Sequence, residues 1–166
     1  LLDGQYVSSG AQAQGTEAGI YVTSTAQATE YHISNTNVLL CKVGMDIQGS
    51  AGAEPKGFYL SNSGFIKNLT GIKGTAVSGA LGLQVANSHF NNKTHSITGY
   101  FQQLILNGNL FYAQPEAVAN AVILQVTAAG GTHSEFVSFI INNNHFVNNS
   151  TSTGVYGIVL GTDGES

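Results

Sequence analysis

The sequence is poor in charge and contains no arginine. Charged residues make up 8% of its 166 residues, against about 25% in an ordinary globular domain. Five lysines face nine acidic residues, so the formal net charge is −4. Proteins hold nucleic acids mainly through Lys and Arg contacts to phosphate, so this composition argues against a nucleic-acid partner.

Cysteine and long apolar runs are also scarce. The single cysteine, Cys41, cannot form an internal disulfide, and its apolar surroundings at residues 38–41 predict a buried thiol. No stretch approaches the ~20 apolar residues of a membrane span, so no membrane insertion is expected. No signal peptide opens the chain, which leaves export without one or trimmed ends as alternatives.

Helical periodicity is nearly absent, whereas strand patterns are frequent. Gly, Asn, Ser and Thr interrupt the windows in which a 3.6-residue period would be seen. Short alternating runs rich in Val, Ile, Phe and Tyr take their place. With 42% hydrophobic residues, the chain can bury a core, and we expect one all-β domain over residues 1–166.

The strand patterns recur at similar intervals along the chain. One motif is an apolar residue, a spacer, an asparagine, two small or polar residues and a second apolar residue. Its anchors are Asp3, Asn35, Asn62, Asn87, Asn107 and Asn143. A second motif recurs between the anchors, at residues 19–22, 44–47, 71–74, 96–98, 122–124 and 155–158.

A period near 25 residues predicts a solenoid. It is too short for the about 40–45 residues of a propeller blade, and the leucine-rich consensus is missing. One coil of a three-stranded parallel β-helix fits this length. We therefore predict a right-handed, single-stranded parallel β-helix with about five to six coils.

Stacked coils explain why side chains recur. An inward asparagine could bond its equivalents above and below in a ladder, although asparagine also simply marks turns. Four sequons, at Asn68, Asn92, Asn148 and Asn149, are interpreted as structural asparagines at a second turn. One apolar column is predicted inside, with the members Val38, Phe65, Phe90, Leu110 and Phe146.

These coils resemble the pectate-lyase-like right-handed β-helix superfamily, and most of all the shaft of bacteriophage tailspikes. The resemblance rests on Gly19-Ile20-Tyr21-Val22, Gly44-Met45-Asp46-Ile47 and the segment 61–68, and it covers nearly the whole chain. It implies a homotrimer in the virion tail, outside the cell, that binds and often cleaves bacterial surface polysaccharide. No end cap is recognisable, so an uncapped fragment of a longer chain is expected.

Alternation along the strands identifies outward positions for sugar binding. Tyr21, Asp46, Lys73 and Thr98 should stack on one outer face, and His32, Tyr59 and Gln84 on another, with Glu30 beside His32. Sugars are bound by flat aromatic surfaces next to hydrogen-bonding groups. The predicted substrate-binding residues are Tyr21, His32, Tyr59 and Lys73.

Catalysis would need a pair of acids. Glycoside hydrolysis commonly uses two carboxylates roughly 5–9.5 Å apart. The candidates are Glu30, Asp46 and Glu54, which lie in the most acidic part of the chain. The alternative interpretation is that each is a solvated surface group, with Asp46 paired to Lys73.

Other chemistry finds little support in the sequence. Pectate-lyase-type elimination commonly needs an arginine and clustered Asp residues for calcium, and the polygalacturonase motifs are missing. No His/Cys spacing resembles a zinc site, so no metal or cofactor is expected. His89 and His145 occupy equivalent positions too many coils apart to share a metal.

Two functions of different class therefore stay open. One is a tailspike fragment that binds, and could depolymerise, surface polysaccharide. The other is a structural or adhesive β-helix without activity. A cellular polysaccharide lyase or epimerase ranks third, because it lacks arginine and clustered acids.

Overall fold

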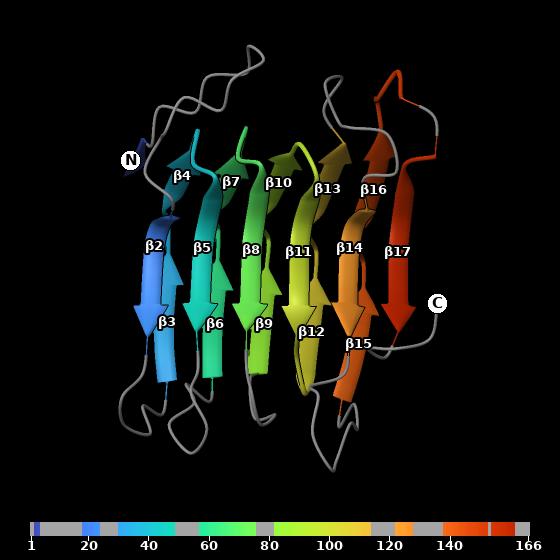
Figure 1. Cartoon of the computed structure of the whole chain (residues 1–166). Helices are drawn as coiled ribbons and strands as arrows, with labels where there is room; N and C mark the ends of the chain where they lie inside the picture. Colours follow the sequence, from blue (N-terminus) through green and yellow to red (C-terminus); the bar gives the residue numbers. More distant parts are fainter. Residues whose placement is uncertain are drawn as a thin grey trace.

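The chain winds through three parallel β-sheets, and the computed structural model describes residues 2–3, 18–23, 30–48, 57–75, 82–113, 122–127, 138–152 and 154–161. Successive strands belong to different sheets, and every third strand returns to the same sheet one rung further along. Figure 1 shows the strands of one sheet side by side in front, with the other two sheets behind. The predicted parallel β-helix is confirmed.

Sheet 1 has six strands in the order β17-β14-β11-β8-β5-β2. Their bounds are β2 Ala18–Thr23, β5 Val43–Gln48, β8 Thr70–Thr75, β11 His95–Tyr100, β14 Val122–Thr127 and β17 Tyr156–Gly161. Its register aligns Ile20, Met45, Ile72, Ile97, Leu124 and Ile158. The second sequence motif is thus one column of the solenoid, as predicted.

Sheet 2 has five strands and sheet 3 has six. The strands of sheet 2 are β3 Glu30–Ser34, β6 Gly57–Ser61, β9 Gly82–Ala86, β12 Gln103–Asn107 and β15 Ser138–Asn142. Those of sheet 3 are β1 Leu2–Asp3, β4 Asn37–Leu39, β7 Gly64–Ile66, β10 His89–Asn92, β13 Leu110–Ala113 and β16 His145–Asn148. A turn of two residues joins each strand of sheet 2 to the next strand of sheet 3.

The core is a set of stacked apolar columns. In sheet 3, Val38 is followed by four phenylalanine rings whose neighbouring centroids lie 5.4, 4.9 and 4.9 Å apart. These rings are Phe65, Phe90, Phe111 and Phe146. The predicted column was therefore wrong at Leu110, which faces outward and is 36% exposed, because Phe111 takes that place.

The anchor asparagines do not point inward as predicted. Asn35, Asn62, Asn87 and Asn143 are exposed and have left-handed backbones, with φ between 49° and 53°. Asparagine tolerates this conformation better than most residues, so these positions turn the chain between sheets 2 and 3. The alternative interpretation, that asparagine marks turns, is the correct one for these residues.

Two anchors were misaligned. The backbone N–H of Gly108 bonds to Asn142 O, as Asn87 N–H bonds to Asn107 O one rung earlier. Gly108, with φ 68°, therefore takes the turn position that was assigned to Asn107. Asp3 pairs with Leu39 in sheet 3, so it does not belong to this turn either.

A buried polar ladder does exist, one residue after each turn residue. Thr36 N–H donates to Ser63 Oγ (3.3 Å), and Ser63 N–H donates to Ser88 Oγ (3.1 Å). Ser88 N–H and Asn109 N–H continue the ladder, at 2.9 Å each, to the Oδ1 atoms of Asn109 and Asn144. Each side chain thus satisfies a backbone donor of the rung before it, which is what buried polar groups require.

A second ladder follows sheet 3 at the next turn. Cys41 N–H donates to Asn68 Oδ1 (2.9 Å), and Asn68 N–H donates to Asn92 Oδ1 (3.2 Å). Asn68 and Asn92 are buried, which confirms that these two sequon asparagines are structural. Cys41 is also fully buried, as predicted, and its thiol donates to Leu39 O (3.3 Å).

Candidate functional site

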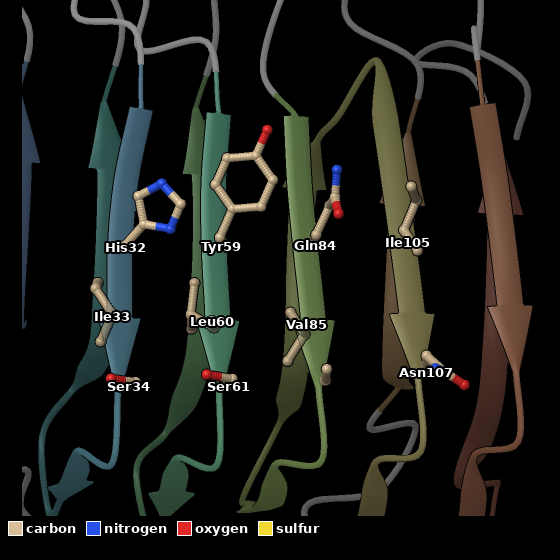
Figure 2. Close-up of a pocket in the computed structure, with 11 residues that line it drawn as sticks. His32, Ile33, Ser34, Tyr59, Leu60, Ser61, Gln84, Val85, Ile105 and Asn107 are labelled. Atoms are coloured by element: carbon tan, nitrogen blue, oxygen red, sulfur yellow. The ribbon is translucent and has the colours of Figure 1, made fainter.

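A groove of about 440 Å³ runs along the outer face of sheet 2. Figure 2 shows rows of side chains that cross β3, β6, β9 and β12. The tall row consists of His32, Tyr59, Gln84 and Ile105, and the small row of Ser34, Ser61, Ala86 and Asn107. Ile33, Leu60 and Val85 also line the groove and lie in a row between these two.

Strand alternation and register produce the tall row. In β3, the outward residues Glu30, His32 and Ser34 alternate with the inward residues Tyr31 and Ile33. The register then places Tyr59, Gln84 and Ile105 on successive rungs beside His32, about 4.8 Å apart. The predicted stacking of His32, Tyr59 and Gln84 on one outer face is confirmed.

The rings of His32 and Tyr59 stack on each other across two neighbouring rungs. Their centroids are 4.8 Å apart and their planes differ by 11°. Next to these rings, Ser34 and Ser61 offer hydroxyl groups, and Gln84 and Asn107 offer side-chain amides. Aromatic rings beside neutral donors and acceptors can bind the apolar face and the hydroxyls of a sugar at the same time.

The groove has little charge. Among the described residues, its acidic neighbour is Glu30, whose Oε2 lies 3.5 Å from His32 Nε2. Both side chains are well exposed, so solvent screens this pair and it contributes little to stability. The other residues that line the groove are neutral, which favours an uncharged polar ligand over a phosphate or a polyanion.

The other predicted binding residues lie on the outer face of sheet 1. The register aligns Tyr21, Asp46, Lys73 and Thr98, so their predicted stacking is also confirmed. Tyr21 Oη donates to Gln48 Oε1 (2.9 Å), and Gln48 Nε2 donates to Asp46 Oδ2 (3.0 Å). The tyrosine ring stays 57% exposed.

Asp46 is held by its own strand rather than by lysine. Within the described ranges, Asp46 and Lys73 form no ion pair, whereas the Glu30 carboxylate lies 3.5 Å from His32 Nε2. The Oδ1 atom of Asp46 is buried and lacks a hydrogen-bond partner among the described residues. The expected Asp46–Lys73 pair is therefore not formed.

The predicted catalytic acids do not form one column. Glu30 begins β3 in sheet 2, whereas Asp46 lies in β5 of sheet 1. Glu54 lies outside the described residues. The catalytic role of these three acids stays a prediction.

Where the structure is described, no three His, Cys, Asp or Glu side chains gather as metal ligands. The described residues include no helix that is long and apolar enough to cross a bilayer. His89 and His145 occupy one column of sheet 3 with Leu110 between them, two rungs apart as expected.

Sequence reasoning identified the tall row but missed the small one. Ser34, Ser61 and Asn107 line the groove because they lie two residues after an outward residue on the same strand. That spacing is visible in the sequence, and it would have found all three.

Searches against known protein families, curated proteins and solved structures found no match for this chain.

Proposed function

We propose that this chain binds a polysaccharide along the outer face of sheet 2. The observation that carries the proposal is the neutral groove of about 440 Å³ walled by the stacked rings of His32 and Tyr59. The ring pair would contact the apolar face of a sugar unit. Ser34, Ser61, Gln84 and Asn107 would exchange hydrogen bonds with its hydroxyls.

The proposal also includes the class of protein to which this chain belongs. Parallel β-helix architecture, low charge and a neutral groove support a host-recognition part of a bacteriophage tailspike, which would contact bacterial surface polysaccharide as a homotrimer. Analytical ultracentrifugation tests the assembly, because a trimer has three times the 17.3 kDa chain mass. A monomeric chain at micromolar concentration would argue against the trimer and leave the groove to be tested separately.

Binding is tested with an array of bacterial capsular and O-chain polysaccharides, together with dextran, galactan and mannan. For the best-bound polymer, Tyr59→Ala should weaken binding at least about fivefold, because an aromatic contact is worth about 1 kcal/mol beyond its buried area. Tyr59→Phe keeps the ring and should bind within twofold of the original chain. Tyr112→Ala is the matched control, since Tyr112 faces outward from β13 in sheet 3 and away from the groove.

Two further results decide between the open alternatives. Tyr21→Ala distinguishes the sheet 2 groove from the outer face of sheet 1. If the polymer binds in the groove, Tyr21→Ala should keep its affinity, and if it binds to sheet 1, Tyr21→Ala should weaken binding. Incubation of the chain with the bound polymer, followed by size-exclusion chromatography, tests depolymerisation. Binding without shorter products would support a binding module, and the absence of binding to every polymer would favour a structural β-helix.

A further inference from the structure

A second groove, of about 500 Å³, lies on the other side of the turn between sheets 2 and 3. Its lining includes Asn62 and Asn87 at the turn, and Asn37 and His89 at the starts of β4 and β10. The two grooves share a border, since Ser61, Ala86 and Asn107 of the first directly precede Asn62, Asn87 and Gly108 of the second. A ligand that leaves the first groove across the turn therefore enters the second.

The amides of Asn37, Asn62 and Asn87 in this groove have no hydrogen-bond partners among the described residues. Over the described residues, the side chains of Asn37, Asn62 and Asn87 make no hydrogen bond, unlike the buried amides of Asn68 and Asn109. Each amide carries two donors and an acceptor, so one rung after another presents unused hydrogen-bonding capacity. Sugar hydroxyl groups can accept hydrogen bonds from the amide donors and donate to the amide acceptors.

Glycines leave the space that the amides of Asn37 and Asn87 occupy. A Cβ atom added at Gly64 would collide with Asn37 Oδ1, and one added at Gly108 would lie 2.7 Å from Asn87 Oδ1. The amides of Asn37 and Asn87 thus lie over glycines of the next rung. Any larger residue at Gly64 or Gly108 would displace them.

The rest of the lining is neutral and partly apolar. Burial lowers the pKa of His89, so its imidazole is uncharged at neutral pH and can both donate and accept. Ile66 and the exposed Leu110 add apolar surface. Unpaired amides, a neutral imidazole and apolar patches suit an uncharged sugar unit better than an anion.

We infer that Asn62 and Asn87 form a second sugar subsite, so that one glycan chain crosses the turn and occupies both grooves. The inference rests on the proposed function and extends it to a longer ligand. The left-handed turn alone does not require asparagine, because Gly108 fills the same position one rung later. An amide at this turn therefore adds hydrogen-bonding capacity that glycine lacks.

The test uses the full chain and two fragments of the best-bound polymer, a trisaccharide and an octasaccharide, in isothermal titration calorimetry. The variant combines Asn62→Gly with Asn87→Gly, which removes both amides but keeps residues that accept positive φ. We expect the octasaccharide Kd to rise at least threefold and the trisaccharide Kd to stay within twofold. Asn35→Gly is the control, since Asn35 has the same backbone conformation and lies outside both grooves.

The outcomes separate the two proposals. The second subsite would be overturned, with the first groove left intact, by any of three results. These are an octasaccharide Kd that rises less than threefold, an equal rise in Kd for both fragments, or a matching rise in the Asn35→Gly control. If the original chain binds no glycan at all, the proposed function itself fails. Circular dichroism melting of each variant verifies that the fold is unchanged.

Discussion

Asn68 offers the sharpest test of the buried ladder. It is fully buried, and its Oδ1 accepts the Cys41 N–H at 2.9 Å. Its Nδ2 donates to Val38 O and to Asn92 Oδ1, at 3.1 Å each. Asn68→Ala therefore leaves at least one buried donor and one buried acceptor without this partner. At about 1–3 kcal/mol for each unsatisfied group, we expect a loss of about 2–6 kcal/mol in the free energy of unfolding.

Asn68→Asp distinguishes hydrogen bonding from packing, because the side chain keeps its volume. One carboxylate oxygen can still accept from Cys41 N–H, but the other would face the acceptors Val38 O and Asn92 Oδ1. At neutral pH this variant should be at least as unstable as Asn68→Ala. Burial and the two acceptors raise the pKa of the introduced carboxyl above its unfolded value. Its penalty should therefore be full above the folded-state pKa and shrink as the pH falls towards about 4.

Urea denaturation followed by circular dichroism measures both variants at pH 7 and pH 4.5. Asn62→Gly, at an exposed turn residue of the same coil, should change the free energy of unfolding by less than about 0.5 kcal/mol. The ladder would be refuted if Asn68→Ala cost no more than Asn62→Gly. It would also be refuted if Asn68→Asp matched the original chain at pH 7.

Three further predictions concern the stacked core, the glycines and acid stability. Phe90→Ala should cost about 3–5 kcal/mol in urea denaturation, because Phe90 is fully buried between two stacked rings, whereas an equal cost for Tyr112→Ala would contradict this. Gly44→Ala should lower Tm, since its Cβ would lie 2.6 Å from Gly71 O, while Gly157→Ala meets no atom within 4 Å and should not; equal shifts would be inconsistent with the packing. Burial lowers the pKa of His95 despite its hydrogen bond with Gln125, so the unfolded chain binds a proton first and stability should fall as the pH drops through about 6.5. His95→Gln should flatten that dependence, and an NMR titration with the His95 pKa at or above 6.5 would disprove it.

The repeat made the fold predictable from sequence, because each coil must place equivalent residues in equivalent positions. Alternation within Glu30–Ser34 and Val43–Gln48 was enough to identify the outward columns that the register confirms. One-residue differences were harder to detect. Asn107-Gly108 offers two residues that suit a turn, and only the backbone hydrogen bonds show that the glycine takes it. That shift also moved the predicted core residue from Phe111 to Leu110.

The sequence did not show which asparagine side chains point to solvent and which point inward. A left-handed backbone at Asn62 points its side chain to solvent, while the next residue, Ser63, points inward and caps the rung before it. Sequence motifs show both residues but not which one carries the positive φ. The candidate site was predictable only in part. His32 and Tyr59 were predicted as an outward pair, but the grooves beside them depend on small neighbouring residues and were not predicted.

The two polar roles of asparagine explain how this fold can carry a site without losing stability. The side-chain amides of Asn68 and Asn109 form hydrogen bonds with buried backbone groups, so replacement of either residue should destabilise the fold. The backbones of Asn62 and Asn87 are held by their left-handed conformation and by N–H bonds to Ala86 O and Asn107 O, whereas their side-chain amides make no hydrogen bond within the described residues. Because glycine can meet the same conformational need, these turn positions can vary in sequence while the solenoid stays intact. A β-helix with such turns can therefore change its ligand at the turn residues without rebuilding its core.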